Sequence, residues 1–202
     1  MATGLLAFSQ IAGLLDACHS SLMKDHLLRL EKRILFVCLG NICRSPIAEG
    51  IFRDVTIQRG FGKNFIIDSA GLGSWHIGNP ADERAQAALR LRGIDISGKR
   101  ARRIAQEDFE TFDLILAMDR SNRDHLLKLA PKQHQHKIAL LMEYAPNLSI
   151  HEIPDPFFGE ANGFDYACQL IDAACRGLFV SLTAQAGSQA TPAARPLAPL
   201  NG

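Results

Sequence analysis

LFVCLGNICRSPIAEG, residues 35–50, joins two hydrophobic patterns that belong to different secondary structures. It opens on a continuous apolar run, which is typical of a strand buried on both faces, and it closes on apolar residues at helical spacing. Between these patterns lie Gly40 and Asn41, two residue types that tolerate unusual backbone angles. Pro46 follows, and proline fits the first turn of a helix. The stretch therefore predicts a strand, a tightly curled loop and a helix.

Strand and helix patterns alternate over most of the remaining chain. Strand patterns cover 33–38, 64–71, 112–119 and 137–142, and helical patterns cover 46–60, 82–93, 120–130 and 164–182. Parallel strands need crossover connections, and these are usually helices. The alternation therefore predicts an α/β fold with a single four-stranded parallel sheet and helices on both faces. In such folds ligands bind beyond the carboxyl ends of the strands, which is where the loop of residues 38–44 lies.

Composition limits the possible functions. The chain has 202 residues, of which 47% are hydrophobic, and a formal net charge of +1, so one domain with a sizeable core is expected and no nucleic-acid partner is indicated. Its five cysteines are an odd number in a chain too large to need disulfide bonds, which favours a reducing, cytoplasmic location.

The two ends differ from the middle of the chain. Residues 1–31 form an N-terminal extension with leucines at helical spacing, and polar residues interrupt its apolar clusters, which predicts an amphipathic helix and argues against a signal peptide or membrane span. Burial of those leucines needs the domain or a second copy of the chain, so we expect the extension to dock on the domain or to mediate self-association. Residues 32–183 are the expected catalytic domain. Residues 184–202, rich in Ala, Pro, Ser and Gly, predict a disordered tail.

The loop between strand and helix is suited to bind a phosphate group. A helix N-terminus is electropositive, a Gly-Asn loop can turn backbone N–H groups toward one centre, and Arg44 can donate two parallel hydrogen bonds. The same field favours the thiolate form of Cys38. With the Ser45 hydroxyl beside it to stabilise the sulfur, Cys38 suits attack on phosphorus and a cysteinyl-phosphate intermediate.

The segment VCLGNICRSPIAE resembles the signature of the low-molecular-weight protein tyrosine phosphatases, C-x5-R with Asn in the loop and Ser-Pro after the Arg. IDSAGLGSW, FDLILAMDRSN and IPDPFFG resemble other segments of that family in the same order, and the similarity spans residues 33–180. The resemblance implies a flavodoxin-like sheet of strand order 2-1-3-4. It also implies hydrolysis of a phosphotyrosine-containing protein or a small aryl phosphate without a cofactor or metal.

The resemblance assigns roles to individual residues. Asp155 would act as general acid and then as general base. Asn41 and Ser69 would brace the loop, and Asp119 would orient the guanidinium of Arg44. The phosphate-binding loop would consist of Leu39, Gly40, Asn41, Ile42, Cys43 and Arg44. The cleft walls that set specificity would be Leu39, Trp75, Phe157 and Phe158.

Two positions depart from the family or add to it. Lys99 stands where the family usually places a His that helps to fix the loop Asn, and a lysine cannot accept a hydrogen bond. Loop rigidity then depends more on Ser69, or Lys99 adds positive potential near the site. Cys43 is either a redox partner that captures an oxidised Cys38 or a small residue packed behind the loop.

Three other functions compete with this interpretation. A thioredoxin-coupled arsenate reductase on the same scaffold would need two further cysteines near the site, but Cys168 and Cys175 have helical core spacing. A phosphoarginine phosphatase typically has Thr where Ile42 stands. A non-catalytic phosphate-binding adaptor would lack one of the three catalytic residues, and all three are present.

Overall fold

Residues 31–159 and 162–188 are described by the structure, a computed structural model, and residues 31–181 form one compact unit. The predicted amphipathic helix at the N-terminus and most of the predicted disordered tail lie outside the described residues, and the division of the chain into extension, domain and tail stays a prediction.

A single parallel sheet organises this unit, as the sequence predicts. The strand order is β2-β1-β3-β4, so the winding reverses next to the first strand. β1 pairs with β2 over its full length, with Cys38 opposite Gly71, and it pairs with β3 on its other side. The strands are β1 (Lys32–Cys38), β2 (Phe65–Gly71), β3 (Leu114–Ala117) and β4 (Ile138–Leu140).

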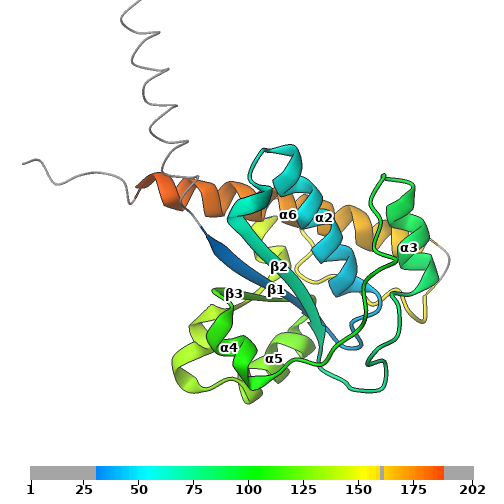
Figure 1. The fold of residues 1–202 in the computed structure, drawn as a ribbon, viewed down its shortest axis with the longest axis horizontal. Helices are drawn as coiled ribbons and strands as arrows, with labels where there is room; N and C mark the ends of the chain where they lie inside the picture. Colours follow the sequence, from blue (N-terminus) through cyan, green and yellow to red (C-terminus); the bar gives the residue numbers. More distant parts are fainter. Residues whose placement is uncertain (1–30, 160–161, 189–202) are drawn as a thin grey trace, which may run out of the picture. The chain divides into compact units, whose positions relative to one another are not determined.

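Helices cover both faces of the sheet (Figure 1). In this view α2, α3 and α6 lie above the strands, and α4 and α5 lie below them. The α-helices are α2 (Arg44–Gln58), α3 (Glu83–Arg90), α4 (Gln106–Thr111), α5 (Arg120–Leu129) and α6 (Gly163–Ser188). Short 3-10 helices are η1 (Gly62–Asn64), η2 (Lys132–Lys137) and η3 (Leu141–Tyr144).

The central strand β1 contributes to a core on each side. Leu35 and Val37 belong to the cluster that α4 and α5 cover, together with Phe109 and Leu126. The alternate residue Phe36 points to the opposite face, where its ring packs at 5.8 Å from that of Phe52 in α2. Burial on both faces explains why this strand reads as an uninterrupted apolar run.

Some elements differ from the sequence prediction. The helix α4 was not expected, because only Phe109 in its six residues is strongly apolar and no period is visible. The last two strands are shorter than expected, and residues 141–144 turn into η3. Residues 132–137, expected as a loop, form η2. Residues 184–188, assigned to the tail, continue α6 to Ser188.

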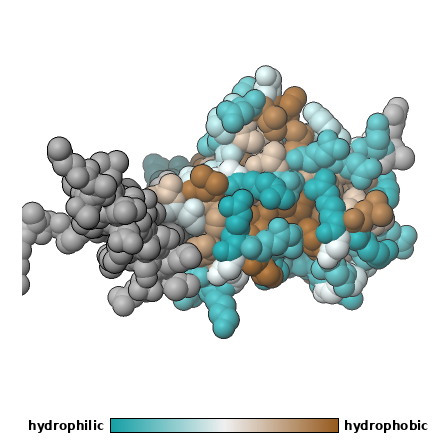
Figure 2. Space-filling view, turned by 90° about the horizontal axis from the view of Figure 1, so that it is seen from above, coloured by the Kyte–Doolittle hydropathy of each residue, from teal (hydrophilic) through white to brown (hydrophobic). Residues whose placement is uncertain are grey.

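Of the helices in the described part of the chain, α6 alone is long and apolar enough to cross a membrane, over residues 163–184. Its apolar residues are largely buried, however, and Ile171, Ala174 and Leu178 have no exposed surface. Figure 2, the view from above, shows hydrophobic patches broken up by hydrophilic side chains. The hydrophobicity of α6 is thus accounted for by packing in the domain core.

Candidate active site

The site is built at the carboxyl end of β1, where the strand gives way to the loop of residues 38–44 (the phosphate loop). Cys38 is the last residue of the strand and is only 3% exposed. Its Sγ accepts a hydrogen bond from the backbone N–H of Asn41 at 3.3 Å and lies 3.1 Å from Ser45 Oγ. Two hydrogen-bonding groups therefore surround the sulfur, and both can stabilise a thiolate.

Asn41 locks the phosphate loop in its curled form. Its φ is 57°, in the left-handed region that Asn tolerates better than most residues. Its Nδ2 donates to Ser45 Oγ and Ser69 Oγ, both at 2.9 Å, and its Oδ1 accepts from the backbone N–H of Arg102 at 2.9 Å. The amide thus uses both N–H groups and its oxygen, which fixes the direction in which it points.

The phosphate loop also needs a close approach to β2. A Cβ placed on Gly71 would lie 3.0 Å from the backbone N of Asn41 and 3.0 Å from the carbonyl carbon of Gly40. Any larger residue at 71 would therefore push the loop away from the strand. The glycine lets Leu72 donate its N–H to the Cys38 carbonyl at 3.0 Å, directly beyond the paired strands.

Arg44 is the first residue of α2, and its guanidinium is held from several sides. Its Nη1 donates to Asp119 Oδ2 at 2.6 Å and to the Ile153 carbonyl at 3.0 Å, while its Nη2 donates to Asp155 Oδ2 at 2.7 Å. The arginine is 2% exposed. A buried planar fork with fixed orientation is what bidentate binding of a tetrahedral oxyanion requires.

Asp119 serves two elements at once. It caps α5, since its Oδ1 accepts from the backbone N–H of Asn122 at 2.6 Å, and its other oxygen holds Arg44. The sequence placed Asp119 at the end of the third strand, whereas that strand ends at Ala117 and Asp119 is the N-cap of the following helix. A rigid helix end thereby fixes the carboxylate that orients the arginine.

The start of α2 is electrostatically suited to an anion. Cys43 is its N-cap residue but makes no side-chain capping bond, and there is no acidic residue in the first turn. The N–H groups of a first helical turn need partners from outside the helix. A bound oxyanion can supply them and is favoured by the helix dipole.

Cys43 is a neutral thiol in these surroundings. It is 4% exposed, and burial, reinforced by the Asp82 carboxylate, raises the pKa of its thiol well above the usual range. The two cysteines of the loop therefore have different environments, because hydrogen-bond donors reach the sulfur of Cys38.

A pocket of about 140 Å³ opens above the loop. The expected walls are present, with Phe158 at 93% and Trp75 at 62% exposure on the rim. His76 also lines this pocket, and sequence reasoning missed it, although its position next to Trp75 was the available signal. The lining residues are Cys38, Leu39, Gly40, Ile42, Cys43, Arg44, Trp75, His76, Asp155, Phe157 and Phe158.

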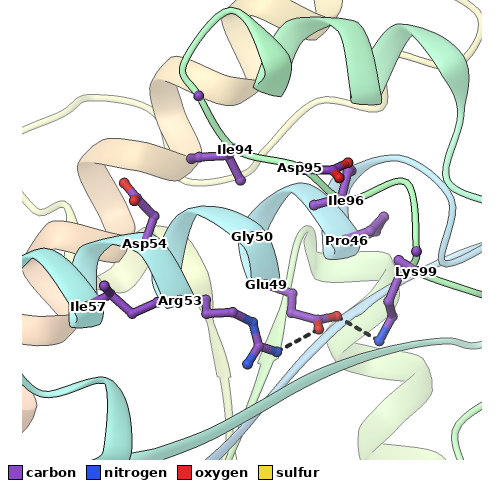
Figure 3. A pocket seen from close by; sticks show the side chains of 12 residues that line it. Pro46, Glu49, Gly50, Arg53, Asp54, Ile57, Ile94, Asp95, Ile96 and Lys99 are labelled. Carbon is purple, nitrogen blue, oxygen red and sulfur yellow. Dashed lines mark hydrogen bonds and ion pairs between the residues drawn. The ribbon is translucent and has the colours of Figure 1, made fainter.

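Lys99 reaches the phosphate loop indirectly, through Glu49, and Figure 3 shows this ion pair in a groove of about 430 Å³ beside α2. The Glu49 carboxylate lies between Lys99 Nζ, at 2.7 Å, and Arg53 Nη2, at 2.9 Å. The same carboxylate accepts from Ser69 Oγ at 2.8 Å, and Ser69 in turn accepts from Asn41. Sequence reasoning missed Glu49, whose position one helical turn after Ser45 was the only local signal.

Lys99 also pairs with Asp68 at 2.5 Å. Burial alone would raise the pKa of the Asp68 carboxyl, but Lys99 and then Arg102 outweigh burial and hold that pKa below its usual value. Two carboxylates therefore neutralise the lysine. Of the two expectations, this geometry favours a loop whose rigidity depends on Ser69 over free positive potential at Lys99, and it adds that Lys99 supports Ser69 through Glu49.

We expect Lys99→Met to lower kcat/KM for an aryl phosphate about fivefold, because loss of a partly buried ion pair of about 1 kcal/mol would loosen Glu49, Ser69 and Asn41 in turn. Lys63→Met, at an exposed position before β2, is the matched control and should retain wild-type kinetics. Lys99→His should restore activity at low pH more than at high pH, because only imidazolium can pair with both carboxylates. Steady-state kinetics from pH 5 to 8 would measure this, and equal kinetics for all four proteins would contradict it.

Within residues 31–159 and 162–188, no group of three His, Cys, Asp or Glu side chains is placed to hold a metal ion. Fold and site together define a class of protein, an α/β domain that binds an oxyanion beside a cysteine between its first strand and first helix.

Comparison with known proteins specifies that class. Residues 33–188 match the family model of low molecular weight phosphotyrosine protein phosphatases. The chain is 42% identical over 149 residues to the Bacillus subtilis low molecular weight protein-tyrosine-phosphatase YfkJ, covering 74% of this chain and 94% of the relative. It is 43% identical over 147 residues to the human low molecular weight phosphotyrosine protein phosphatase, covering 72% and 92%.

A solved structure agrees with these relatives. The protein tyrosine phosphatase from Entamoeba histolytica, crystallised with Hepes in its active site, superposes with a TM-score of 0.74 and 35% identity, over 77% of this chain and 99% of that one. The chain belongs to the low molecular weight phosphotyrosine protein phosphatase family.

Proposed function

We propose that this protein hydrolyses aryl phosphate monoesters, and phosphotyrosine in proteins above all, through a cysteinyl-phosphate intermediate. One observation carries the proposal: Cys38, Arg44 and Asp155 line one pocket whose rim is aromatic. The pocket thus combines a nucleophile, a cation for the phosphate and a carboxyl group for proton transfer.

In the first step the Cys38 thiolate attacks phosphorus. An S–P bond forms and the bond from phosphorus to the aryl oxygen breaks. Arg44 and the N–H groups at the start of α2 hold the phosphate oxygens, where negative charge increases in the transition state. Protonated Asp155 gives its proton to the departing oxygen, so that a phenol rather than a phenolate leaves.

In the second step a water molecule attacks the phosphocysteine. Asp155, now a carboxylate, takes a proton from that water, the S–P bond breaks and inorganic phosphate is released. The sulfur leaves as a thiolate, which the N–H of Asn41 and the hydroxyl of Ser45 stabilise. The Ser45 hydroxyl has a single proton and lies within reach of both Cys38 Sγ and the Ala70 carbonyl, so it can turn toward the sulfur as charge appears there.

Arg44 and Asp155 form an ion pair. Asp155 Oδ2 holds Arg44 Nη2, one of the donors that a bound phosphate needs. Phosphate binding would take over this donor and release the carboxyl group, which can then accept a proton and face the leaving oxygen. Asp155 is suited to this exchange because its side chain is 38% exposed and its Oδ1 makes only a local bond to the Phe157 N–H at 3.2 Å.

The aromatic rim supports an aryl substrate. The rings of Phe157 and Phe158 meet edge to face at 4.8 Å, and Trp75 lies across the same pocket. Such walls stack against a phenyl ring above the phosphate loop. Ile42 in the loop has no hydroxyl, whereas a phosphoarginine phosphatase typically has Thr at this position.

The competing functions receive less support from the geometry. Cys168 and Cys175, the candidate redox pair of a reductase, are 1% and 0% exposed in α6. Burial raises the pKa of both thiols, which disfavours the thiolates that disulfide exchange needs. The redox role of Cys43 stays a prediction, and its raised pKa would slow the capture of an oxidised Cys38.

A cytoplasmic location is proposed from the cysteines, since Cys38, Cys43, Cys168 and Cys175 form no disulfide bonds and the fold does not need them. We also propose that the N-terminal extension mediates self-association. Its residues lie outside the described part of the chain.

Asp155→Ala tests the proposed chemistry. We expect a loss of about 10²-fold in kcat on phenyl phosphate, whose leaving group is basic, and a much smaller loss on 4-nitrophenyl phosphate, whose phenolate leaves unaided. With the second substrate, hydrolysis of the phosphocysteine should become limiting, so stopped flow should show a burst of nitrophenolate before slow turnover.

Equal losses on both substrates without a burst would remove Asp155 from the acid role. Arsenate reduction by wild type, assayed in parallel with a thioredoxin system, should be absent, and reduction at a rate near that of hydrolysis would favour the reductase instead.

A further inference from the structure

The segment of residues 153–159 (the acid segment) carries Asp155. Ile153 and Pro156 bury their side chains, but few hydrogen bonds tie the segment to the rest of the described chain. Its start is anchored by the Ile153 N–H, which donates to the Met118 carbonyl at 2.8 Å. Arg44 binds the Ile153 carbonyl and the Asp155 carboxylate. Two local hydrogen bonds lie within the segment, from the Phe157 N–H to Asp155 and from the Gly159 N–H to the Pro156 carbonyl.

One other side chain among the described residues donates a hydrogen bond to the acid segment. Arg84, the second residue of α3, donates from Nη1 to the Phe157 carbonyl at 3.2 Å. Its guanidinium also lies over two aromatic rings, 5.5 Å from the centroid of Phe157 and 4.6 Å from that of Phe164. Phe164 is 2% exposed in the first turn of α6, so one face of the guanidinium rests on the fixed core.

Arg84 is itself held in place from the other side. The carboxylate of Asp82 accepts from its Nε at 3.0 Å, from its Nη2 at 2.9 Å and from its backbone N–H at 2.9 Å. Asp82 is the N-cap of α3, and its own N–H donates to the Ile42 carbonyl in the phosphate loop at 2.8 Å. A continuous series of contacts therefore joins the phosphate loop to the acid segment through Arg84.

We propose that Arg84 is a positioning residue for the general acid, and that it keeps Asp155 above the phosphate loop while Arg44 is occupied by substrate. This inference rests on the proposed function. Arg44 and Arg84 both hold the acid segment, but catalysis requires Arg44 to exchange Asp155 for phosphate. Among the described side chains, Arg84 is then the one that still donates a hydrogen bond to the segment beyond Asp155.

The expected consequence of removing Arg84 is a loss of kcat that is larger for substrates with a more basic leaving group. Without the guanidinium, the Phe157 carbonyl and ring lose their partner, and Asp155 spends less time within hydrogen-bond reach of the aryl oxygen. Phosphate binding itself should persist, because the hydrogen bonds that hold Cys38, Asn41 and Arg44 come from groups other than Arg84.

The test compares Arg84→Met with Arg90→Met, an exposed arginine at the other end of the same helix. For Arg84→Met we expect kcat to fall about tenfold on phenyl phosphate and about twofold or less on 4-nitrophenyl phosphate, with the inhibition constant of vanadate unchanged. Arg90→Met should match wild type on both substrates. Arg84→Gln retains one donor for the Phe157 carbonyl and should lie between the two, which provides a milder variant if Arg84→Met folds poorly.

The double variant Arg84→Met/Asp155→Ala separates positioning from general structural damage. If Arg84 acts through Asp155, the double variant should be no slower on phenyl phosphate than Asp155→Ala alone. Independent losses that multiply would overturn the proposal, and so would equal losses on both substrates in Arg84→Met and Arg84→Gln. If Asp155→Ala itself shows no dependence on the leaving group, the acid role in the proposed function fails first; if it shows one and the Arg84 variants do not, only the role of Arg84 fails.

Discussion

Cys38→Ser is expected to abolish turnover of aryl phosphates, with kcat reduced by at least about 10³-fold, while the protein stays folded. The replacement is nearly the same size as the buried thiol. A serine hydroxyl, however, is a poor nucleophile without a general base, and the groups next to Cys38 are the N–H of Asn41 and the hydroxyl of Ser45. These groups stabilise a thiolate but cannot deprotonate an alcohol near neutral pH.

The measurement pairs kinetics with ligand binding. Cys38→Ser should give no burst of nitrophenolate and no phosphorylated protein by mass spectrometry, yet it should still bind inorganic phosphate, because Arg44 and the start of α2 are unchanged. Cys168→Ala, at a buried position in α6, is the control for removal of a thiol and should retain kcat. Substantial hydrolysis by purified Cys38→Ser would refute the covalent mechanism.

Arg44→Lys is expected to lower kcat by about 10²–10³-fold, a loss as large as that from removing a key oxyanion donor. A lysine is a point charge that cannot form two parallel hydrogen bonds to phosphate. In this chain the fork has a second task, since one of its nitrogens holds Asp119 and the Ile153 carbonyl while the other holds Asp155. A single ammonium cannot bind all three partners in that geometry.

Thermal unfolding and vanadate inhibition distinguish the causes of this loss. We expect weaker inhibition by vanadate and a lower melting temperature, because the carboxylates of Asp119 and Asp155 lose part of the paired positive charge that offsets their burial. Arg59→Lys, at an exposed position just after α2, should leave both quantities unchanged. Near-normal turnover of Arg44→Lys would show that the arginine does not clamp the phosphate.

The strongly patterned parts of the fold were predictable from local sequence. β1 and β2 were located to within one residue of their observed ends. Burial of β1 on both faces leaves a continuous apolar run, whereas β2, an edge strand with Ile66 exposed, was indicated by the apolar residues that precede Gly71. The helix α4 was not predictable, because its six residues show no helical apolar period and its stability comes from contacts with neighbouring parts of the fold. Asp108 accepts from the backbone N–H of Ala105 at 2.8 Å and pairs with Arg102, and Phe109 fills the core below the sheet.

The site residues also divide into those that local sequence indicates and those that it does not. Cys38, Asn41 and Arg44 lie within seven residues, so one loop brings them together and the sequence indicates them directly. Asp119 and Asp155 were placed by resemblance. They lie 75 and 111 positions from Arg44 along the chain, and no sequence spacing reveals that they meet it.

The sequence by itself determined the succession along the chain of the four strands and of α2, α3, α5 and α6, and the chemistry of the phosphate loop, because both depend on residues close together in the chain. The tertiary structure alone decided which distant side chains support that loop. Glu49 joins Lys99 to Ser69, and Arg84 joins the start of α3 to the acid segment. The physical reason is that hydrogen bonds and ion pairs act over about 3 Å, and only the winding of the sheet brings these side chains within that distance.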